Sequence, residues 1–176
     1  MHLPTWVTGA GGPFSSRRKG PIPNFVRWTR QQMSGDEKMT QEREGFEDFM
    51  RRREAVSTDY INGKADGLLA LSAKHDPATF FPPSGDRIQG ASRVNAANEK
   101  GAHNFGEGST GHFEILDSSS SGDLGFWTGI QHAEVMMKGK DEPVSMQLRT
   151  TEVFRREEGE WKLVHRHADM PDSKRS

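Results

Sequence analysis

The stretch VSMQLRTTEVFRREEGEWKLVHRHAD, residues 144–169, decides the fold because it predicts two long strands joined by a tight turn. Side chains of an extended chain alternate between the two faces of a sheet, and both halves of this stretch show that alternation. Glycine and charged residues in REEGE interrupt the pattern and indicate a hairpin turn. One face of the first half is apolar apart from a threonine and one carboxylate. It carries Met146, Leu148, Thr150, Glu152 and Phe154.

More strands are predicted upstream of this hairpin. GHFEILD, residues 111–117, and DLGFWTGIQHAEVMM, residues 123–137, both read as strands, and Gly125 and Gly129 predict bulges or bends in the second. ATFFPPSGDRIQG, residues 78–90, predicts two short strands around a tight turn. Its two prolines cannot donate to a sheet ladder, which confines the segment to an edge or a bend.

Helical patterns dominate the earlier part of the chain. Thr40 is expected to cap a first helix, whose apolar residues recur at helical spacing up to Tyr60. Residues 65–74 and 91–102 predict two further helices. Helices followed by an antiparallel meander predict an α+β fold, with the helices packed on one face of a curved antiparallel or mixed sheet. Such a half-barrel leaves a pocket between the helices and the sheet.

The ends of the chain differ in character from this domain. Residues 1–38 are rich in glycine, proline, serine and arginine, and predict a disordered basic tail. An organellar transit peptide and a start that really lies at Met33 or Met39 are alternatives that the sequence leaves open. We expect the folded domain to span residues 39–171, followed by a short tail at 172–176.

Composition excludes several classes of function. The chain has 176 residues, a net charge of −1 and no cysteine. The absence of cysteine excludes disulfides, thiol nucleophiles and cysteine-ligated zinc. We expect a cytoplasmic protein with neither a nucleic acid nor a membrane as partner. The run RRR at 51–53 is expected to be a solvated helix face or an intersubunit ion pair.

Three segments of the chain resemble the nuclear transport factor 2-like superfamily, and within it the SnoaL-like and ketosteroid-isomerase-homologue branch. They are INGKADGLLALSAKHDPATFF at 61–81, GDLGFWTGIQHAEV at 122–135 and LRTTEVFRREEGEWKLVHRHAD at 148–169. The resemblance implies a cone-shaped fold with a deep pocket, usually in a dimer. It does not imply one chemistry, because the superfamily holds isomerases, cyclases and dehydratases beside non-enzymatic transport and oligomerisation domains.

The resemblance can be followed residue by residue. Where ketosteroid isomerases carry their general-base aspartate, this chain has Pro82. Their oxyanion-hole tyrosine falls near Ser57 and their second acid near Glu152. Steroid isomerisation by that mechanism is therefore not expected. A pocket histidine of the superfamily's dehydratases falls near His103.

The last strand ends in polar residues. If its alternation continues unbroken, one face carries Trp161, Leu163, His165, His167 and Asp169. The two histidines would lie about 6.5–7 Å apart and leave three alternatives open. They are a metal site completed from neighbouring strands, an acid–base site, and structural hydrogen bonds at a strand end or dimer contact. Asp169 would fix the tautomer of His167 or cap the strand.

Further candidates lie on the other predicted elements. Glu152, alone on an apolar face, has either a raised pKa and an acid–base role or a salt bridge with Arg149, Arg166 or another arginine. Trp127 and Gln131 share one face of their strand, and Tyr60 ends the first helix. We expect these three side chains to contact a ligand.

Two functions remain open at this point. One is a small-molecule-binding protein, an acid–base isomerase, cyclase or dehydratase on a small apolar substrate, without a cofactor. His165 or His167, Glu152 and His103 would transfer protons, and Trp127, Tyr60, Gln131 and Asp169 would position the ligand. The other is a non-catalytic ligand-sensing or dimerisation module. Either protein is expected to form a homodimer.

Overall fold

The computed structural model describes residues 44–171. The predicted tails at 1–38 and 172–176 and the residue Thr40 lie outside the described residues. The prediction that Thr40 caps the first helix is wrong, because this helix begins at Phe46 and Gly45 is its N-cap residue. The helices are α1 (Phe46–Tyr60), α2 (Asp66–Leu71) and α3 (Ala91–Ala102). The strands are β1 (Thr79–Phe81), β2 (Ile88–Gln89), β3 (Thr110–Ser121), β4 (Leu124–Val135), β5 (Val144–Glu157) and β6 (Glu160–Asp169).

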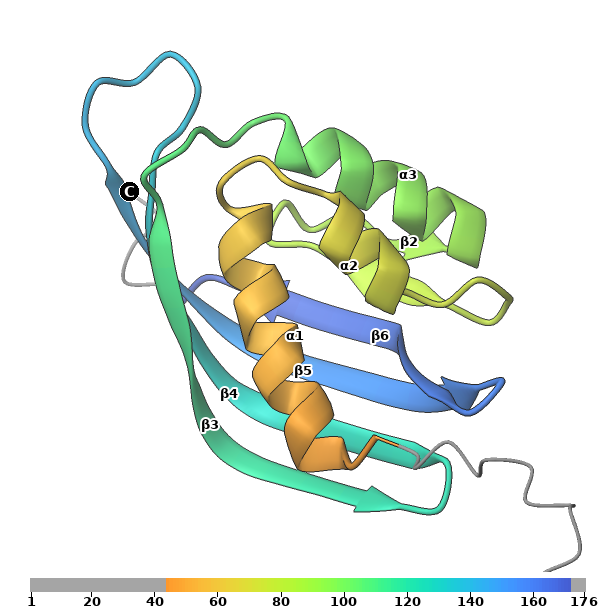
Figure 1. The fold of residues 1–176 in the computed structure, drawn as a ribbon. Helices are drawn as coiled ribbons and strands as arrows, with labels where there is room; N and C mark the ends of the chain where they lie inside the picture. Colours follow the sequence, from red (N-terminus) through yellow and green to blue (C-terminus); the bar gives the residue numbers. More distant parts are fainter. Residues whose placement is uncertain (1–43, 172–176) are drawn as a thin grey trace, which may run out of the picture. The chain divides into compact units, whose positions relative to one another are not determined.

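These strands form one mixed sheet in the order β2-β1-β6-β5-β4-β3. Neighbouring strands are antiparallel except for β1, which runs parallel to β6. The three helices lie on one side of the curved, open sheet (Figure 1). The predicted α+β fold, with helices packed on a curved mixed sheet, is confirmed. No helix within residues 44–171 has the length and apolar character needed to cross a membrane.

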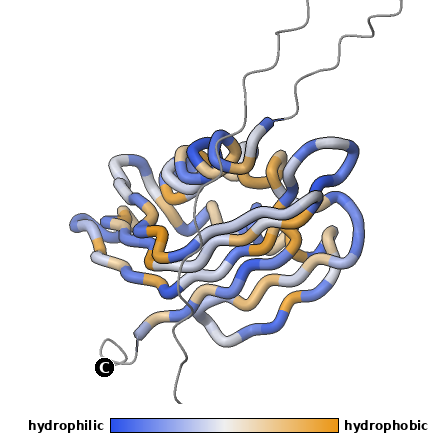
Figure 2. Tube along the Cα trace, turned by 90° about the horizontal axis from the view of Figure 1, so that it is seen from below, coloured by the Kyte–Doolittle hydropathy of each residue, from blue (hydrophilic) through white to orange (hydrophobic). Residues whose placement is uncertain are grey.

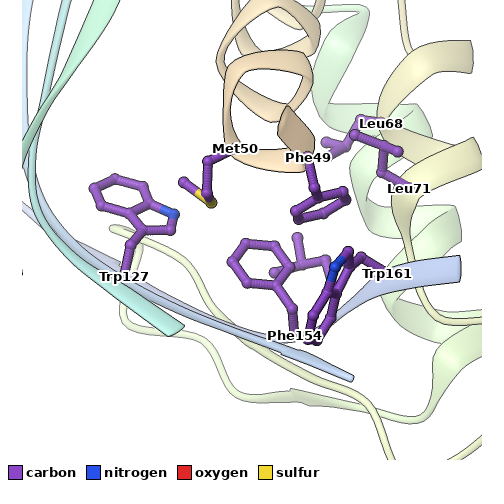
Figure 3. Close-up of a cluster of buried hydrophobic side chains, with 8 residues drawn as sticks. Phe49, Met50, Leu68, Leu71, Trp127, Phe154 and Trp161 are labelled. Atoms are coloured by element: carbon purple, nitrogen blue, oxygen red, sulfur yellow. The ribbon is translucent and has the colours of Figure 1, made fainter. Parts of the chain in front are cut away.

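Helix α1 contributes the centre of the hydrophobic core. The ring of Phe49 packs edge-on against that of Phe154 in β5, with centroids 4.9 Å apart, and Trp161 of β6 lies beside both rings. In the view of Figure 3, Met50 fills the space between these rings and Trp127 of β4. Burial of each such side chain contributes about 1.5–3 kcal/mol. The full cluster is Phe49, Met50, Leu68, Leu71, Trp127, Phe154, Trp161 and Leu163.

Polar and apolar residues alternate along the long strands (Figure 2). In β5 the face that is apolar in the sequence is the buried one at the centre of the strand, where Leu148, Thr150, Glu152 and Phe154 are all buried. In β6 the alternation breaks. His165 pairs with Val153, but the next pair along the ladder joins Leu163 to Phe154. Val164 is therefore an extra residue, a β-bulge. After it, each side chain of β6 points to the face opposite to the one that unbroken alternation would give.

Strand β3 extends beyond its predicted end. It continues to Ser121 and pairs with β4 along its whole length, so that the serine run forms part of a long hairpin closed at Gly122. The bulge of this hairpin lies in β3 between Ile115 and Asp117, opposite Gly129. The prediction of a bulge at the β4 glycines is wrong, because the irregularity lies in β3. A bend at these glycines stays a prediction, and both allow close approach of a neighbouring group. A Cβ on Gly125 would lie 2.6 Å from the ring of Phe46.

Gly129→Ala should destabilise the protein by about 1–3 kcal/mol, because the added methyl group overpacks the hairpin. Its Cβ would lie 2.0 Å from the carbonyl oxygen of Glu114, a backbone atom that cannot turn away. Urea unfolding followed by circular dichroism measures the loss. Gly106→Ala is the matched control, because its Cβ would meet nothing closer than 3.6 Å. An equal effect of the two substitutions would contradict the steric explanation.

Candidate ligand-binding site

A cavity of about 450 Å³ lies between the helices and the sheet. Helices α1, α2 and α3 and strands β1, β2, β4, β5 and β6 all contribute to its wall. The volume falls within the range of cavities that hold small organic molecules. Most of the lining is apolar, and it includes Ile61, Leu68, Val94, Val135, Met146 and Leu148.

Two arginines that line this cavity share one buried carboxylate behind them. Arg53 of α1 donates to Glu152 of β5 through Nε to Oε2 at 3.0 Å and through Nη2 to Oε1 at 2.6 Å. Arg166 of β6 donates through Nη1 to the same Oε1. Glu152 is fully buried and is not part of the cavity wall. The ion-paired cluster therefore joins three elements at the cavity wall.

Neutral side chains complete the hydrogen bonding of this cluster. Trp127 Nε1 donates to Glu152 Oε2 at 2.8 Å, so that each carboxylate oxygen accepts two hydrogen bonds. Arg166 Nη2 donates to Gln131 Oε1 at 2.6 Å, and Gln131 Nε2 donates to Ser57 Oγ at 3.0 Å. An ionised carboxylate has about four acceptor positions. All four acceptor positions of Glu152 are occupied, so none is left to accept a hydrogen bond from a ligand.

Glu152 is held in its ionised form. Burial alone would raise its pKa, but the charges of Arg53 and Arg166, together with hydrogen bonds from Arg53 and Trp127, bring the pKa below its usual value. The predicted raised pKa is wrong, and the alternative of a salt bridge is confirmed. The partners are Arg53 and Arg166, whereas Arg149 pairs with Asp169.

The histidines of the last strand lie away from the cavity. Because Val164 is a bulge, Arg166 and Ala168 line the cavity and His165 and His167 point to the opposite face. The prediction that both histidines and Asp169 share a face with Trp161 and Leu163 is wrong for this reason.

On that outer face the histidines make local contacts. His165 Nδ1 lies 2.7 Å from Thr79 Oγ1, and both imidazole rings pack edge-on against Phe81. Burial lowers the pKa of His165, and the charge of the neighbouring His167 lowers it further. His103 is exposed at the end of α3 and does not line the cavity. In the described part of the chain, no group of three or more histidine or carboxylate side chains has the arrangement of a metal site.

Two of the predicted ligand contacts line the cavity, and the prediction that Trp127 does so is wrong. Tyr60 and Gln131 line the cavity, whereas Trp127 is buried in the core and contacts Glu152. Burial raises the pKa of the Tyr60 hydroxyl, although the charges of Arg166 and Arg53 oppose this. The hydroxyl is therefore a donor near neutral pH. It lies so close to α3 that a Cβ on Gly101 would approach it to 2.3 Å.

Sequence reasoning missed Arg53, Arg166 and Asn98 as cavity residues. The prediction of a solvated RRR face is wrong for Arg53, which is 2% exposed. Its position was nevertheless encoded, since Phe49, Arg53 and Ser57 follow one another at four-residue spacing on one helix face. Asn98 of α3 is buried and lines the cavity, and its amide makes no hydrogen bond within the described residues.

Glu152→Gln should destabilise the protein by about 3–5 kcal/mol, because it leaves two guanidinium groups buried without their counter-charge. Urea unfolding measures this loss. Asp169→Asn is the matched control, since Asp169 also pairs with an arginine through two hydrogen bonds but on the exposed face, where ion pairs contribute less than about 1 kcal/mol. A loss from Glu152→Gln no larger than the control's would contradict the assigned role.

The contribution of Glu152 to stability should depend on pH in one direction. Because folding lowers its pKa, the contribution is fully present above the unfolded value of about 4.3 and is lost as the pH falls through the folded pKa. The difference in unfolding free energy between the wild type and Glu152→Gln should therefore be constant at neutral pH and shrink only in acid. Urea unfolding of both proteins across this range tests it. A difference that instead grows as the pH falls from neutral would indicate a raised pKa.

Comparison with known proteins identifies the family of this chain. The profile of the SnoaL-like domain matches residues 53–173. A comparison with curated proteins gave no match.

Solved structures share the fold at low sequence identity. A nuclear transport factor 2-like superfamily protein from Salmonella enterica is 13% identical, with a TM-score of 0.61 over 73% of this chain and 92% of that one. A candidate dehydratase of the same family from Streptomyces avermitilis is 18% identical, with a TM-score of 0.60 over 72% and 95%. A candidate calcium/calmodulin dependent protein kinase II association domain from Xanthomonas campestris is 14% identical, with a TM-score of 0.59 over 73% and 90%.

These structures establish the fold alone, because their names cover unrelated roles. The profile match extends over more than half of the sequence and agrees with the resemblance of its strands. The chain therefore belongs to the SnoaL-like domain family.

Proposed function

We propose that this protein binds a small, mostly apolar organic molecule in the cavity between its helices and its sheet. The observation that carries the proposal is the wall itself, which is largely apolar but contains a few buried polar side chains. Small-molecule sites typically combine these two properties, since the apolar surface supplies affinity and the polar groups fix orientation. The Tyr60 hydroxyl and the Asn98 amide are free to hydrogen-bond a ligand.

The same wall favours binding over acid–base turnover. Within residues 44–171, no histidine lines the cavity, and Glu152 is ion-paired behind it. Asp86 is the one carboxylate among the described lining residues. It is exposed and accepts a hydrogen bond from Ser84. General acid–base catalysis requires a group of suitable pKa within hydrogen-bond reach of the reacting atom.

Pairing with a second copy of the chain stays a prediction.

Filling the cavity should weaken binding of an apolar probe. Ala97 lines the cavity, whereas its neighbour Ala96 is exposed on the same helix, α3. We expect the neutral probe N-phenyl-1-naphthylamine to bind the wild type and Ala96→Leu equally. Ala97→Leu should bind it about tenfold more weakly, because the added carbons take up ligand space.

Fluorescence titration of the probe against the three proteins measures these affinities. Thermal unfolding of each variant confirms that the fold is kept. Equal binding by Ala97→Leu and Ala96→Leu would place the probe outside the cavity. No binding by any of the three proteins would count against a site for apolar molecules.

A further inference from the structure

We propose that the ligand carries a single negative charge, of the carboxylate class, that pairs with Arg53 and Arg166 inside the cavity. This inference rests on the proposed binding function and adds the chemical class of the ligand. It follows from the charge balance of the cavity wall, from unused hydrogen-bond donors on the arginines, and from the way the guanidinium groups are held.

The inner part of the cavity has one more positive charge than negative charges. Arg53 and Arg166 both line it, and arginine keeps its proton under all ordinary conditions. The single charge of Glu152 lies behind them and balances only one of the two. Elsewhere on the described wall, the exposed Lys100 and Asp86 carry opposite charges, which cancel each other in the sum. A net positive charge therefore remains in largely apolar surroundings.

The arginines also keep donors that Glu152 does not use. Arg53 binds Glu152 through Nε and Nη2, while its buried Nη1 has no hydrogen-bond partner among the described residues. Arg166 uses both of its terminal nitrogens, and its Nε donates to nothing in the described part of the chain. Leaving a buried donor unsatisfied costs about 1–3 kcal/mol, and more when the group is charged. Arg53 Nη1 has almost no accessible surface, whereas Arg166 Nε is not fully buried, so Arg166 is the arginine whose unused donor an anionic acceptor in the cavity would meet.

The position of both guanidinium groups is fixed before any ligand arrives. Glu152 holds each of them, Trp127 holds Glu152, and Gln131 holds the second nitrogen of Arg166. Preorganised donors bind an anion without paying the entropy of ordering long side chains. The planar guanidinium also matches a planar carboxylate. A dianion such as phosphate fits less well, because it would leave a net negative charge in the cavity.

A pair of probes that differ by one anionic group tests the inference. 8-Anilinonaphthalene-1-sulfonate has the ring system of N-phenyl-1-naphthylamine plus one sulfonate, which stands in for the carboxylate. We expect the wild type to bind the sulfonate probe at least about tenfold more tightly than the neutral probe, since a hydrogen bond to a charged group contributes about 1.5–3 kcal/mol.

Two arginine variants then test which part of the protein causes the preference for the anionic probe. Arg166→Gln should reduce the ratio of the two affinities to about one, because Arg53 and Glu152 are left as a neutral pair. Arg149→Gln should keep the ratio of the wild type, because Arg149 pairs with Asp169 on the outer face. Thermal unfolding checks both variants, and if Arg166→Gln does not fold, Arg53→Gln takes its place.

Each outcome bears on a different claim. Equal affinities of the wild type for the two probes would overturn the inferred charge and leave the proposed apolar binding intact. A preference for the sulfonate probe that survives in Arg166→Gln, or in its replacement, would also overturn it, because the charge would then be recognised elsewhere. Binding of neither probe would remove both the inference and the proposed function. Loss of the preference in the cavity variant alone supports the inference.

Discussion

The rest of the structure depends on one buried ion-pair cluster. Glu152 projects from the middle of β5, where it meets Arg53 from the helix layer and Arg166 from the neighbouring strand. The apolar core fixes these elements only approximately, because hydrophobic contact has no direction. The hydrogen bonds of the cluster do have direction, and they set the position of α1 over the sheet. The inner wall of the cavity is thus placed by polar contacts and supported by the aromatic cluster beside it.

Stability alone does not explain why such a cluster is present. Removing charges from water is costly, and replacing a buried ion pair by well-packed apolar residues is often neutral or stabilising. A third ion, Arg166, adds its own desolvation cost, which lowers its pKa despite the nearby carboxylate. The two arginines nevertheless line the cavity, with Glu152 directly behind them. A charged group at a cavity wall, unlike one in the core, can discriminate between small molecules of different charge.

Much of the fold could be predicted from the sequence, whereas much of the site could not. The first helix and the long strands were visible in residue spacing, because burial on one side imposes a period on the sequence. The helix at 91–102 was predicted with its observed bounds, whereas the one predicted at 65–74 ends at Leu71. The apolar face of β5 followed from the same rule, and Glu152 stood out on it. Alternation failed in β6, since the bulge at Val164 depends on how two strands pair and leaves no mark in the spacing.

The arginines of the site were hidden for a related reason. Arg53 lies in a run of three arginines, where composition indicates a solvated surface. Only its spacing from Phe49 and Ser57 marks it as inward-facing, and that signal has meaning once the helix is known to lie on the sheet. Arg166 lies between two histidines that attract more attention as chemical groups. Arg166 lies on the opposite face of β6 from these histidines, and it is the residue that lines the cavity.

The contact between Tyr60 and Gly101 has a consequence for how this family could diversify. The tyrosine hydroxyl fits against α3 only because residue 101 has no side chain. Any larger residue there must push the helix outward or turn the tyrosine, and either movement changes the width of the cavity. A single position outside the ion-pair cluster can thus alter the width of the cavity without changing the cluster's own residues. Ligand size and ligand charge would then evolve independently within one scaffold.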